Sequence, residues 1–434
     1  MDFLIKHPNR EVSSMEKDSV FNLGRMRLSG NQAIARGALE AGVRVTSAYP
    51  GAPISDLQGS FEQLAGNISK KNAFTNKVGE ALERVGYQLA AHWGTTTNED
   101  NAMALALGAV ICKADYKKRE FLTEKEWDLV YGDTVFAQDE EKRIPVGSRV
   151  MCSFKHLGGN TAADALRVAV NVVPYTGGLG LASGDDRQGT SSQTMQDNKV
   201  LYGFHIRIPT LELHSPRNAH STVKNCYRLF EELGVPFAVV MNYDLSYREV
   251  SVDPVMVLDM TANQRRKGFT RDPKHLVTIG PHIRAREHRY HSKLIPLFKT
   301  KIKENFEFLG NRVAAFGDKP KVMLVVNGPF REDFEMVHND PTLRARLNKK
   351  YGDVLVMETD IVFPQPDLLF EELVSKHGIE KIYVFEEGYG RVIYLQLLDL
   401  VNQKELDAKV LDCSIPYEPT IYERFSYIDH IMNI

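Results

Sequence analysis

The chain has 434 residues, more than one ordinary hydrophobic core accommodates, which predicts two or three domains. Its formal net charge of −2 and its charged fraction of 25% lack the basic excess of nucleic-acid-binding proteins and the composition of disordered chains. No apolar stretch has the length of a membrane span and residues 1–20 contain no signal-peptide core, so we expect a cytoplasmic location.

Residues 28–57 change from a helical to a strand-like pattern. The helix is predicted to end at Gly42, and a strand over 43–48 runs into a loop at 49–53 that two prolines bracket. Ligands gather at the carboxyl ends of strands in open α/β sheets. Four residues of this loop are therefore candidate binding residues: Tyr49, Pro50, Gly51 and Ala52.

A helix is predicted after Thr97 and Asn98, either of which can cap it. Alanines and leucines recur at helical spacing over 102–109 and form a narrow apolar stripe. Glu99 falls in the first turn, where free backbone N–H groups favour a negative charge. An acid is common at such a position, so this segment alone leaves the role of Glu99 open.

Residues 113–147 are densely charged without sustained periodicity, so we expect a solvated excursion over the surface. Strands and helices then alternate up to residue 242, which predicts a parallel sheet with helices on both faces. The polar side chains of the loop at 185–197 are expected to satisfy that loop themselves. Glu386 and Glu387 follow a later strand, and we expect them to be interface residues.

The second half of the chain contains a different pattern and then a second α/β unit. Residues 284–312 read as a long, basic, loosely amphipathic helix that connects two domains. Strands and helices alternate again from residue 321, as in a small doubly wound domain.

The four cysteines stand far apart and form no Cys-x-x-Cys pair. Iron–sulfur clusters and structural zinc sites need closely spaced thiolates, so we expect neither of them and no other metal site in this chain. The cysteines read as small buried hydrophobic residues. They are Cys112, Cys152, Cys226 and Cys413.

Several motifs in a fixed order resemble one enzyme family over nearly the whole chain. They read GNQAIARGALEAG, YPGAP, NEDNAMALALGA, KHLGGNTAAD, DDRQGTSSQTMQD, FPQP and FEEG. In this order they resemble the α subunit of thiamine-diphosphate-dependent 2-oxoacid:ferredoxin oxidoreductases, closest to the indolepyruvate type. The resemblance implies an α/β thiamine-diphosphate-binding fold, with a doubly wound parallel sheet of the pyrimidine type and a smaller transketolase C-terminal-like domain.

The resemblance also implies domain boundaries. The pyrimidine-binding domain is expected at 24–250 with an insertion at about 113–147, the connector with its basic helix at 251–319, and the transketolase C-terminal-like domain at 320–434.

Glu99 matches the family's catalytic acid. In the family this carboxylate contacts the aminopyrimidine ring of thiamine diphosphate, and it stabilises the tautomer that activates the cofactor. The resemblance adds Tyr49, Pro50, Gly51 and Ala52 as cofactor-binding residues.

Four further matched positions are candidates for binding the substrate or for organising the loop. Lys155 and His156 either stabilise the substrate carboxylate and developing charge or cap a sheet edge, and both readings stay open. Asn160 is expected to orient their loop, and Arg149 keeps the family's distance from them once the insertion is skipped.

The sequence lacks a Gly-Asp-Gly segment followed by Asn, the pattern that holds magnesium and the cofactor's diphosphate in the family. The resemblance therefore implies that a β-type partner subunit carries the diphosphate and magnesium. Iron–sulfur clusters are expected on γ-type and ferredoxin-like partners and not on this chain. No nucleic acid and no membrane span are expected.

The expected function is oxidative decarboxylation of a small-molecule 2-oxoacid, with the electrons passing to the iron–sulfur clusters. Ala52 stands where the family usually has a threonine that contacts the substrate carboxylate, which favours an aryl or otherwise bulky 2-oxoacid. Coenzyme A and water both stay open as acyl acceptors. Two alternatives also stay open: a non-redox, two-subunit thiamine-dependent decarboxylase, and a non-catalytic scaffold subunit.

Overall fold

The computed structural model describes residues 18–66, 69–87, 89, 93–112, 115–172, 177–187, 197–259, 268–269, 271–415 and 426–434. Within these ranges, no helix is long and apolar enough to cross a membrane. The chain forms two compact units. The first comprises Met1–Gly184, Pro216–Val239 and Leu245–Leu294, and the second comprises Asp185–Ser215, Val240–Asp244 and Ile295–Ile434.

The two units interleave along the sequence. The second unit takes residues 185–215 and 240–244 from within the region 24–250 that we expected to be one domain. The expected boundaries at 24–250, 251–319 and 320–434 came from the family resemblance, whereas the two units are defined by contacts within the chain. The expected boundaries therefore stay a prediction.

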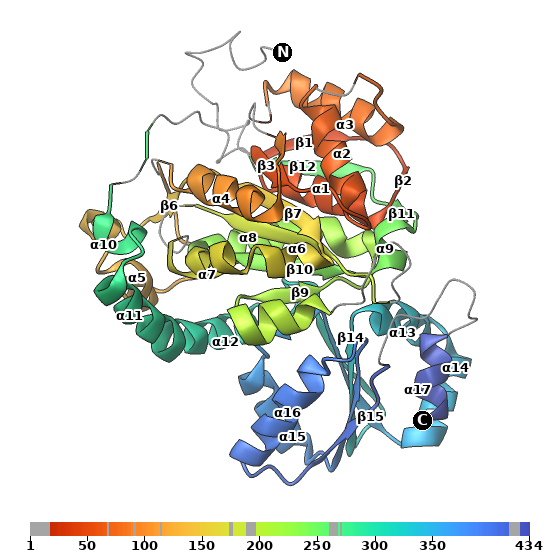
Figure 1. Ribbon diagram of the computed structural model, residues 1–434. Helices are drawn as coiled ribbons and strands as arrows, with labels where there is room; N and C mark the ends of the chain where they lie inside the picture. The colour runs from red at the N-terminus through yellow and green to blue at the C-terminus, as the bar shows by residue number, and fades with distance from the viewer. Residues whose placement is uncertain are drawn as a thin grey trace. The chain divides into compact units, whose positions relative to one another are not determined.

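A parallel sheet forms the centre of the first unit (Figure 1). Its strands follow the order β4-β3-β7-β8, and Thr46 of β3 lies opposite Trp93 of β4 and Met151 of β7. All of β7 and β8 except Lys155 is buried, as expected for strands covered on both faces. The strands are β3 (Val45–Ala48), β4 (Trp93–Thr95), β7 (Val150–Lys155) and β8 (Leu179–Gly184), and β10 (Phe237–Met241) begins in this unit next to β8.

Two pairs of helices pack within the first unit (Figure 1): α4 lies beside α7, and α1 lies beside α8. The α1–α8 pair approaches closely at Gly37, where a Cβ atom would lie 2.4 Å from the carbonyl oxygen of His220. Ser29 and Gln32 form a capping box that starts α1. The helices are α1 (Gly30–Glu40), α2 (Ser55–Leu64), α3 (Ala73–Arg84), α4 (Glu99–Val110), α6 (His156–Thr161), α7 (Ala163–Val172) and α8 (Pro216–Glu232).

Two short antiparallel ribbons complete the first unit. β1 (Asp18–Asn22) pairs with β12 (Val255–Asp259), and β2 (Met26–Leu28) pairs with β11 (Val250–Val252). Thus part of the expected connector region pairs with strands from the start of the chain. Helix α9 (Tyr243–Tyr247) precedes β11. The helices α10 (Pro273–Leu276), α11 (Gly280–Arg289) and η6 (Tyr290–Leu294) follow β12, and α12 (Ile295–Glu304) continues directly in the second unit.

The insertion is folded and docked, so our expectation of a solvated excursion is wrong for its described residues. Trp127 and Tyr131 are each only 1% exposed. The Glu232 carboxylate accepts hydrogen bonds from the backbone N–H groups of residues 120–122. In this segment the buried aromatic residues stand between charged residues at no regular spacing. The sequence pattern therefore did not predict the small core that they form. The elements are β5 (Asp115–Lys117), α5 (Glu124–Tyr131), η2 (Val135–Gln138) and β6 (Ile144–Val146).

The second unit contains a five-stranded sheet in the order β13-β15-β14-β17-β18. β14, β15, β17 and β18 are parallel, and β13 is an antiparallel edge strand. The strands are β13 (Arg312–Phe316), β14 (Val322–Asn327), β15 (Val354–Thr359), β17 (Lys381–Phe385) and β18 (Lys409–Asp412). Outside this sheet, β9 (Thr210–Glu212) pairs antiparallel with β16 (Ile361–Phe363). The helices are η4 (Val200–Ile206), α13 (Pro329–Asn339), α14 (Pro341–Tyr351), α15 (Asp367–His377), α16 (Val392–Gln403) and α17 (Tyr427–Asn433).

The core of the second unit lies between its sheet and the helices α13 and α17. Leu324 and Val326 of β14 pack with Phe330 and Phe334 of α13 in this core. Both units therefore have the alternating β and α elements and the parallel strands that the sequence predicted, and the expected α/β class is confirmed.

Candidate active site

The carboxyl ends of four neighbouring strands converge on one edge of the sheet in the first unit. β3 leads into the loop at 49–53, β4 leads towards Glu99, β7 ends at Lys155, and β8 ends at Gly184. Because the strands are parallel neighbours, these ends share an edge, which is where ligands bind in open α/β sheets.

Glu99 is the first residue of α4 and is buried at 6% exposure. The Asn98 side chain caps the helix by accepting a hydrogen bond from the Asn101 N–H at 2.8 Å. Within the described part of the chain, the Glu99 carboxylate has neither a hydrogen-bond nor an ion-pair partner. A carboxylate without a protein partner at the ligand-binding edge of a sheet marks a place where a ligand can bind.

The loop at 49–53 is anchored on both sides. The Tyr49 N–H donates to the Ser153 carbonyl oxygen at 3.2 Å, and the Asn31 amide donates to the Pro53 carbonyl oxygen at 2.8 Å. Tyr49, Gly51 and Ala52 are half-buried and Pro50 is exposed. The loop therefore presents a fixed, partly accessible surface at the same edge as Glu99.

Helix α6 and its N-cap residue bring a glycine and a lysine to this edge. Lys155 is the last residue of β7 and the N-cap of α6, and its side-chain stem lies against Gly51. Gly158 lies against Glu99: a Cβ atom at 158 would be 2.5 Å from the Glu99 Cγ. His156 is fully buried and Asn160 is exposed on the same helix.

Arg149 is not brought to this edge. It precedes the first residue of β7, so it is about 20 Å from Lys155 along the strand. Its guanidinium donates to Glu231 at 2.7 Å, to Asp259 at 2.6 Å and to the Ala41 carbonyl oxygen. Burial opposes its charge, but these two carboxylates outweigh that effect and raise the pKa of Arg149. Arg149 is thus a buried structural cation, and the candidate site does not include it.

The residues at this edge fit the aminopyrimidine end of thiamine diphosphate. A buried carboxylate without a partner can accept a hydrogen bond from, or share a proton with, a ring nitrogen. Among the described residues, no group of three or more His, Cys, Asp or Glu side chains could hold a metal ion.

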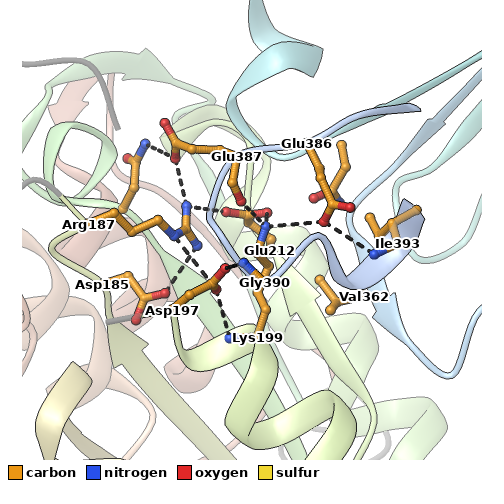
Figure 2. Close-up of polar contacts among 12 residues, drawn as sticks. Asp185, Arg187, Asp197, Lys199, Glu212, Val362, Glu386, Glu387, Gly390 and Ile393 are labelled. Carbon is orange, nitrogen blue, oxygen red and sulfur yellow. Dashed lines mark hydrogen bonds and ion pairs between the residues drawn. The ribbon is translucent and has the colours of Figure 1, made fainter. Parts of the chain in front are cut away.

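A second concentration of charge lies inside the second unit (Figure 2). We call it the Arg187 cluster, and each of its side chains is at most 1% exposed. It comprises Asp185, Arg187, Asp197, Lys199, Glu212, Glu386 and Glu387.

Arg187 is the centre of this cluster. Its guanidinium lies 2.6 Å from a Glu387 oxygen, 2.7 Å from Glu212 and 3.1 Å from Asp185. Lys199 lies 3.0 Å from Glu212 and donates to the Glu387 backbone carbonyl oxygen. Both cations are thus paired with carboxylates of the same unit.

Burial shifts the pKa values of several members of the cluster. Burial raises the pKa of Asp185 to about 7, although Arg187 opposes this shift. Burial likewise raises the pKa of Glu386 to about 6, against the effect of Lys199. Burial disfavours the charged form of Arg187, but Glu212 and the other carboxylates outweigh it and hold the pKa of Arg187 well above its usual value.

The sequence patterns did not predict that these residues meet. Lys199 and Glu212 stood out in no motif, and Glu386 and Glu387, expected at an interface, are buried inside the unit. The one available signal was the run of acids around Arg187 in the 185–197 loop, of which residues 188–196 lie outside the described ranges.

No family model matches the sequence. The chain is 25% identical over 382 residues to the indolepyruvate oxidoreductase subunit IorA of Archaeoglobus fulgidus, covering 87% of this chain and 48% of the relative. It is 28% identical over 373 residues to the IorA subunit of Thermococcus kodakarensis, covering 84% of this chain and 45% of the relative. The chain thus spans about half the length of the curated relatives it matches.

A solved 2-oxoglutarate:ferredoxin oxidoreductase from Magnetococcus marinus has a TM-score of 0.55 and 14% sequence identity to this chain. The match covers 91% of this chain and 63% of that one, and it shows that the fold is shared. The family resemblance of the motifs and the expected thiamine-diphosphate-binding fold class are both confirmed.

Proposed function

Since the chain is related to the α subunits of 2-oxoacid:ferredoxin oxidoreductases, we propose that it is one half of a thiamine-diphosphate-dependent active site that oxidatively decarboxylates a 2-oxoacid. The observation that carries this proposal is the buried carboxylate of Glu99, which has no partner within the described part of the chain and lies at the sheet edge where a ligand binds.

In this proposal, Glu99 hydrogen-bonds the aminopyrimidine ring and holds a proton at its ring nitrogen. The loop at 49–53 forms the wall beside the ring, and α6 keeps the Glu99 side chain from turning away, because Gly158 lies directly against it. When bound, thiamine diphosphate supplies the carbon nucleophile for the 2-oxo group and accepts the electrons released by decarboxylation.

Lys155 is the proposed binding group for the substrate carboxylate. Its stem is held against Gly51, and its ammonium group has no partner among the described residues. A lysine ammonium is a compact charge with several donors, which suits a carboxylate. His156 and Asn160 support the position of α6 in this proposal.

The proposed substrate class rests on the residue at position 52 of the loop. Ala52 carries no hydroxyl group, so the pocket offers one polar contact fewer than the usual threonine, and we propose an aryl 2-oxoacid such as indolepyruvate. Coenzyme A and water remain the two candidate acyl acceptors.

The remaining parts of the active site are assigned to partner subunits. A β-type subunit carries the diphosphate and magnesium, and γ-type and ferredoxin-like subunits carry the iron–sulfur clusters. We place the complex in the cytoplasm.

The test replaces Glu99 in the complex purified with its partner subunits. Glu99→Gln removes the carboxylate but keeps the size of the side chain, and we expect kcat for indolepyruvate-dependent reduction of an electron acceptor to fall by about 10²- to 10⁴-fold. The matched control is Asp100→Asn, since Asp100 is the next acid in the same turn and is exposed.

Asp100→Asn should leave kcat unchanged. Retention of turnover in Glu99→Gln would reject the catalytic role and favour the scaffold alternative. Release of an aldehyde by the wild-type complex without reduction of the acceptor would favour the non-redox decarboxylase.

A further inference from the structure

Gly51 lies in contact with the side chain of Lys155. A Cβ atom at position 51 would be 2.7 Å from the Cδ of Lys155 and 2.9 Å from its Cβ and Cγ. Carbon atoms pack at about 3.5–4.0 Å, so no side chain larger than hydrogen fits beside Lys155 in its present position.

The backbone of the loop does not itself require a glycine at this position. Gly51 is absent from the glycines that have a positive φ angle, so its backbone conformation is open to other residues. Other glycines of the same unit have free space instead: nothing lies within 4 Å of a Cβ atom at Gly59 in α2 or at Gly108 in α4. The requirement at position 51 therefore comes from Lys155.

The loop cannot move away to make room for a larger residue. The Ile54 N–H donates to the Gly51 carbonyl oxygen at 3.1 Å, and Asn31 and Ser153 hold the two ends of the loop. Lys155 is less restricted: it is half-buried, and its side chain makes no capping hydrogen bond to α6. An added methyl group would force the Cγ and Cδ of Lys155 into another rotamer, and it would also press on the Cβ of Lys155, which its backbone fixes.

We infer that Gly51 is a positioning residue for Lys155. By lacking a side chain it lets the lysine stem lie flat on the loop, which restricts the rotamers of a flexible side chain and holds its ammonium group at the sheet edge. This inference rests on the proposed function, in which that ammonium group binds the 2-oxoacid carboxylate. Substrate binding thus depends on a contact between a strand end and the loop of a neighbouring strand.

The experiment compares Gly51→Ala, Lys155→Gly and the double variant, each in the complex with its partner subunits. Lys155→Gly removes all three atoms that a Cβ atom at 51 would meet, and glycine is tolerated at an N-cap. Gly59→Ala is the matched control in the adjacent helix. The measurements are KM and kcat with indolepyruvate, and the Kd of indolepyruvate without an electron acceptor.

We expect Gly51→Ala to raise KM and Kd about 10-fold while kcat changes less than about threefold, and Lys155→Gly to raise KM about 10- to 100-fold. The double variant should equal Lys155→Gly alone, because the clash is gone. An unchanged KM in Gly51→Ala, or additive effects in the double variant, would overturn the inference. If Lys155→Gly itself left KM unchanged, the substrate-binding role of Lys155 in the proposed function would fail instead.

Discussion

Charged side chains are buried in both units, but they are paired in only one of the two sites compared here. In the Arg187 cluster, the guanidinium of Arg187 lies within 3.1 Å of three carboxylates. At the candidate active site, Glu99 and Lys155 have no partners within the described ranges. The two sites therefore differ in pairing, and Lys155 is also only half-buried.

This difference separates a structural role from a binding role. Burial of a charge is unfavourable unless a partner compensates it, so the paired charges of the cluster support the structure of their own unit. A charge without a protein partner at a sheet edge gains no such compensation and is a candidate for binding a ligand. Pairing is thus the better criterion for choosing site residues, and it assigns Arg149 to the structural group.

The largest expected effect on stability is that of removing the centre of the paired cluster. Arg187→Met leaves buried carboxylates uncompensated and should lower the free energy of unfolding by about 3–5 kcal/mol. Lys155→Met is the matched control and should cost less than about 1 kcal/mol, since Lys155 is half-buried and unpaired. Urea denaturation of the full chain measures both. Equal losses in the two variants would abolish the contrast between the sites.

A smaller effect is expected in the pH dependence of stability. Because burial raises the pKa values of Asp185 to about 7 and of Glu386 to about 6, the folded chain binds more protons than the unfolded chain between pH 4 and 7. These groups therefore make stability fall as the pH rises through that window. The favourable contribution of these two groups to the free energy of unfolding is largest at a pH below their pKa in the unfolded chain. It is lost at a pH above their pKa in the folded chain.

Asp185→Asn removes one of these titrating groups. The quantity compared is the free energy of unfolding of the variant minus that of the wild type. We expect this difference to increase by on the order of 1–3 kcal/mol from pH 5 to pH 8, and any constant difference between the two proteins cancels. If urea denaturation gave parallel pH profiles for the two proteins, Asp185 would be ionised throughout this range. The contrast between the Arg187 cluster and the candidate active site would then be supported only by the ion-pair distances.

The smallest effect is expected at the unpaired carboxylate. Glu99→Gln relieves the burial of a charge but loses a favourable interaction with the start of α4, so the free energy of unfolding should rise by at most about 1 kcal/mol. Asp100→Asn only loses the interaction with the start of the helix, so its free energy of unfolding should fall by about 0.3–1 kcal/mol. A loss of several kcal/mol in Glu99→Gln would mean that Glu99 is paired and structural.

Local patterns predicted the parts of the candidate site that are continuous in sequence. The cap at Asn98 with Glu99 behind it, and the proline-bracketed loop at 49–53, depend only on neighbouring residues. Their meeting at one sheet edge follows from alternating strands and helices, which also predicted the α/β class.

Long-range contacts were beyond the reach of these patterns. The Arg187 cluster joins residues up to 200 positions apart, and its members share no period or spacing. The place of Arg149 was not evident from the sequence for a related reason: its distance from Lys155 in sequence is short, but a strand is extended and points its two ends to opposite edges. The docked insertion depends on Glu232, far along the chain.

The sequence by itself determined the order of helices and strands, the family resemblance, and Glu99 as the acid to test, because each of these depends on residues close together along the chain. Only the tertiary structure decided which charges are paired, that Lys155 lies against Gly51, and that Arg149 belongs to the frame of the first unit. The physical reason is that the free energy of a buried charge depends on its neighbours in space, and folding alone selects those neighbours.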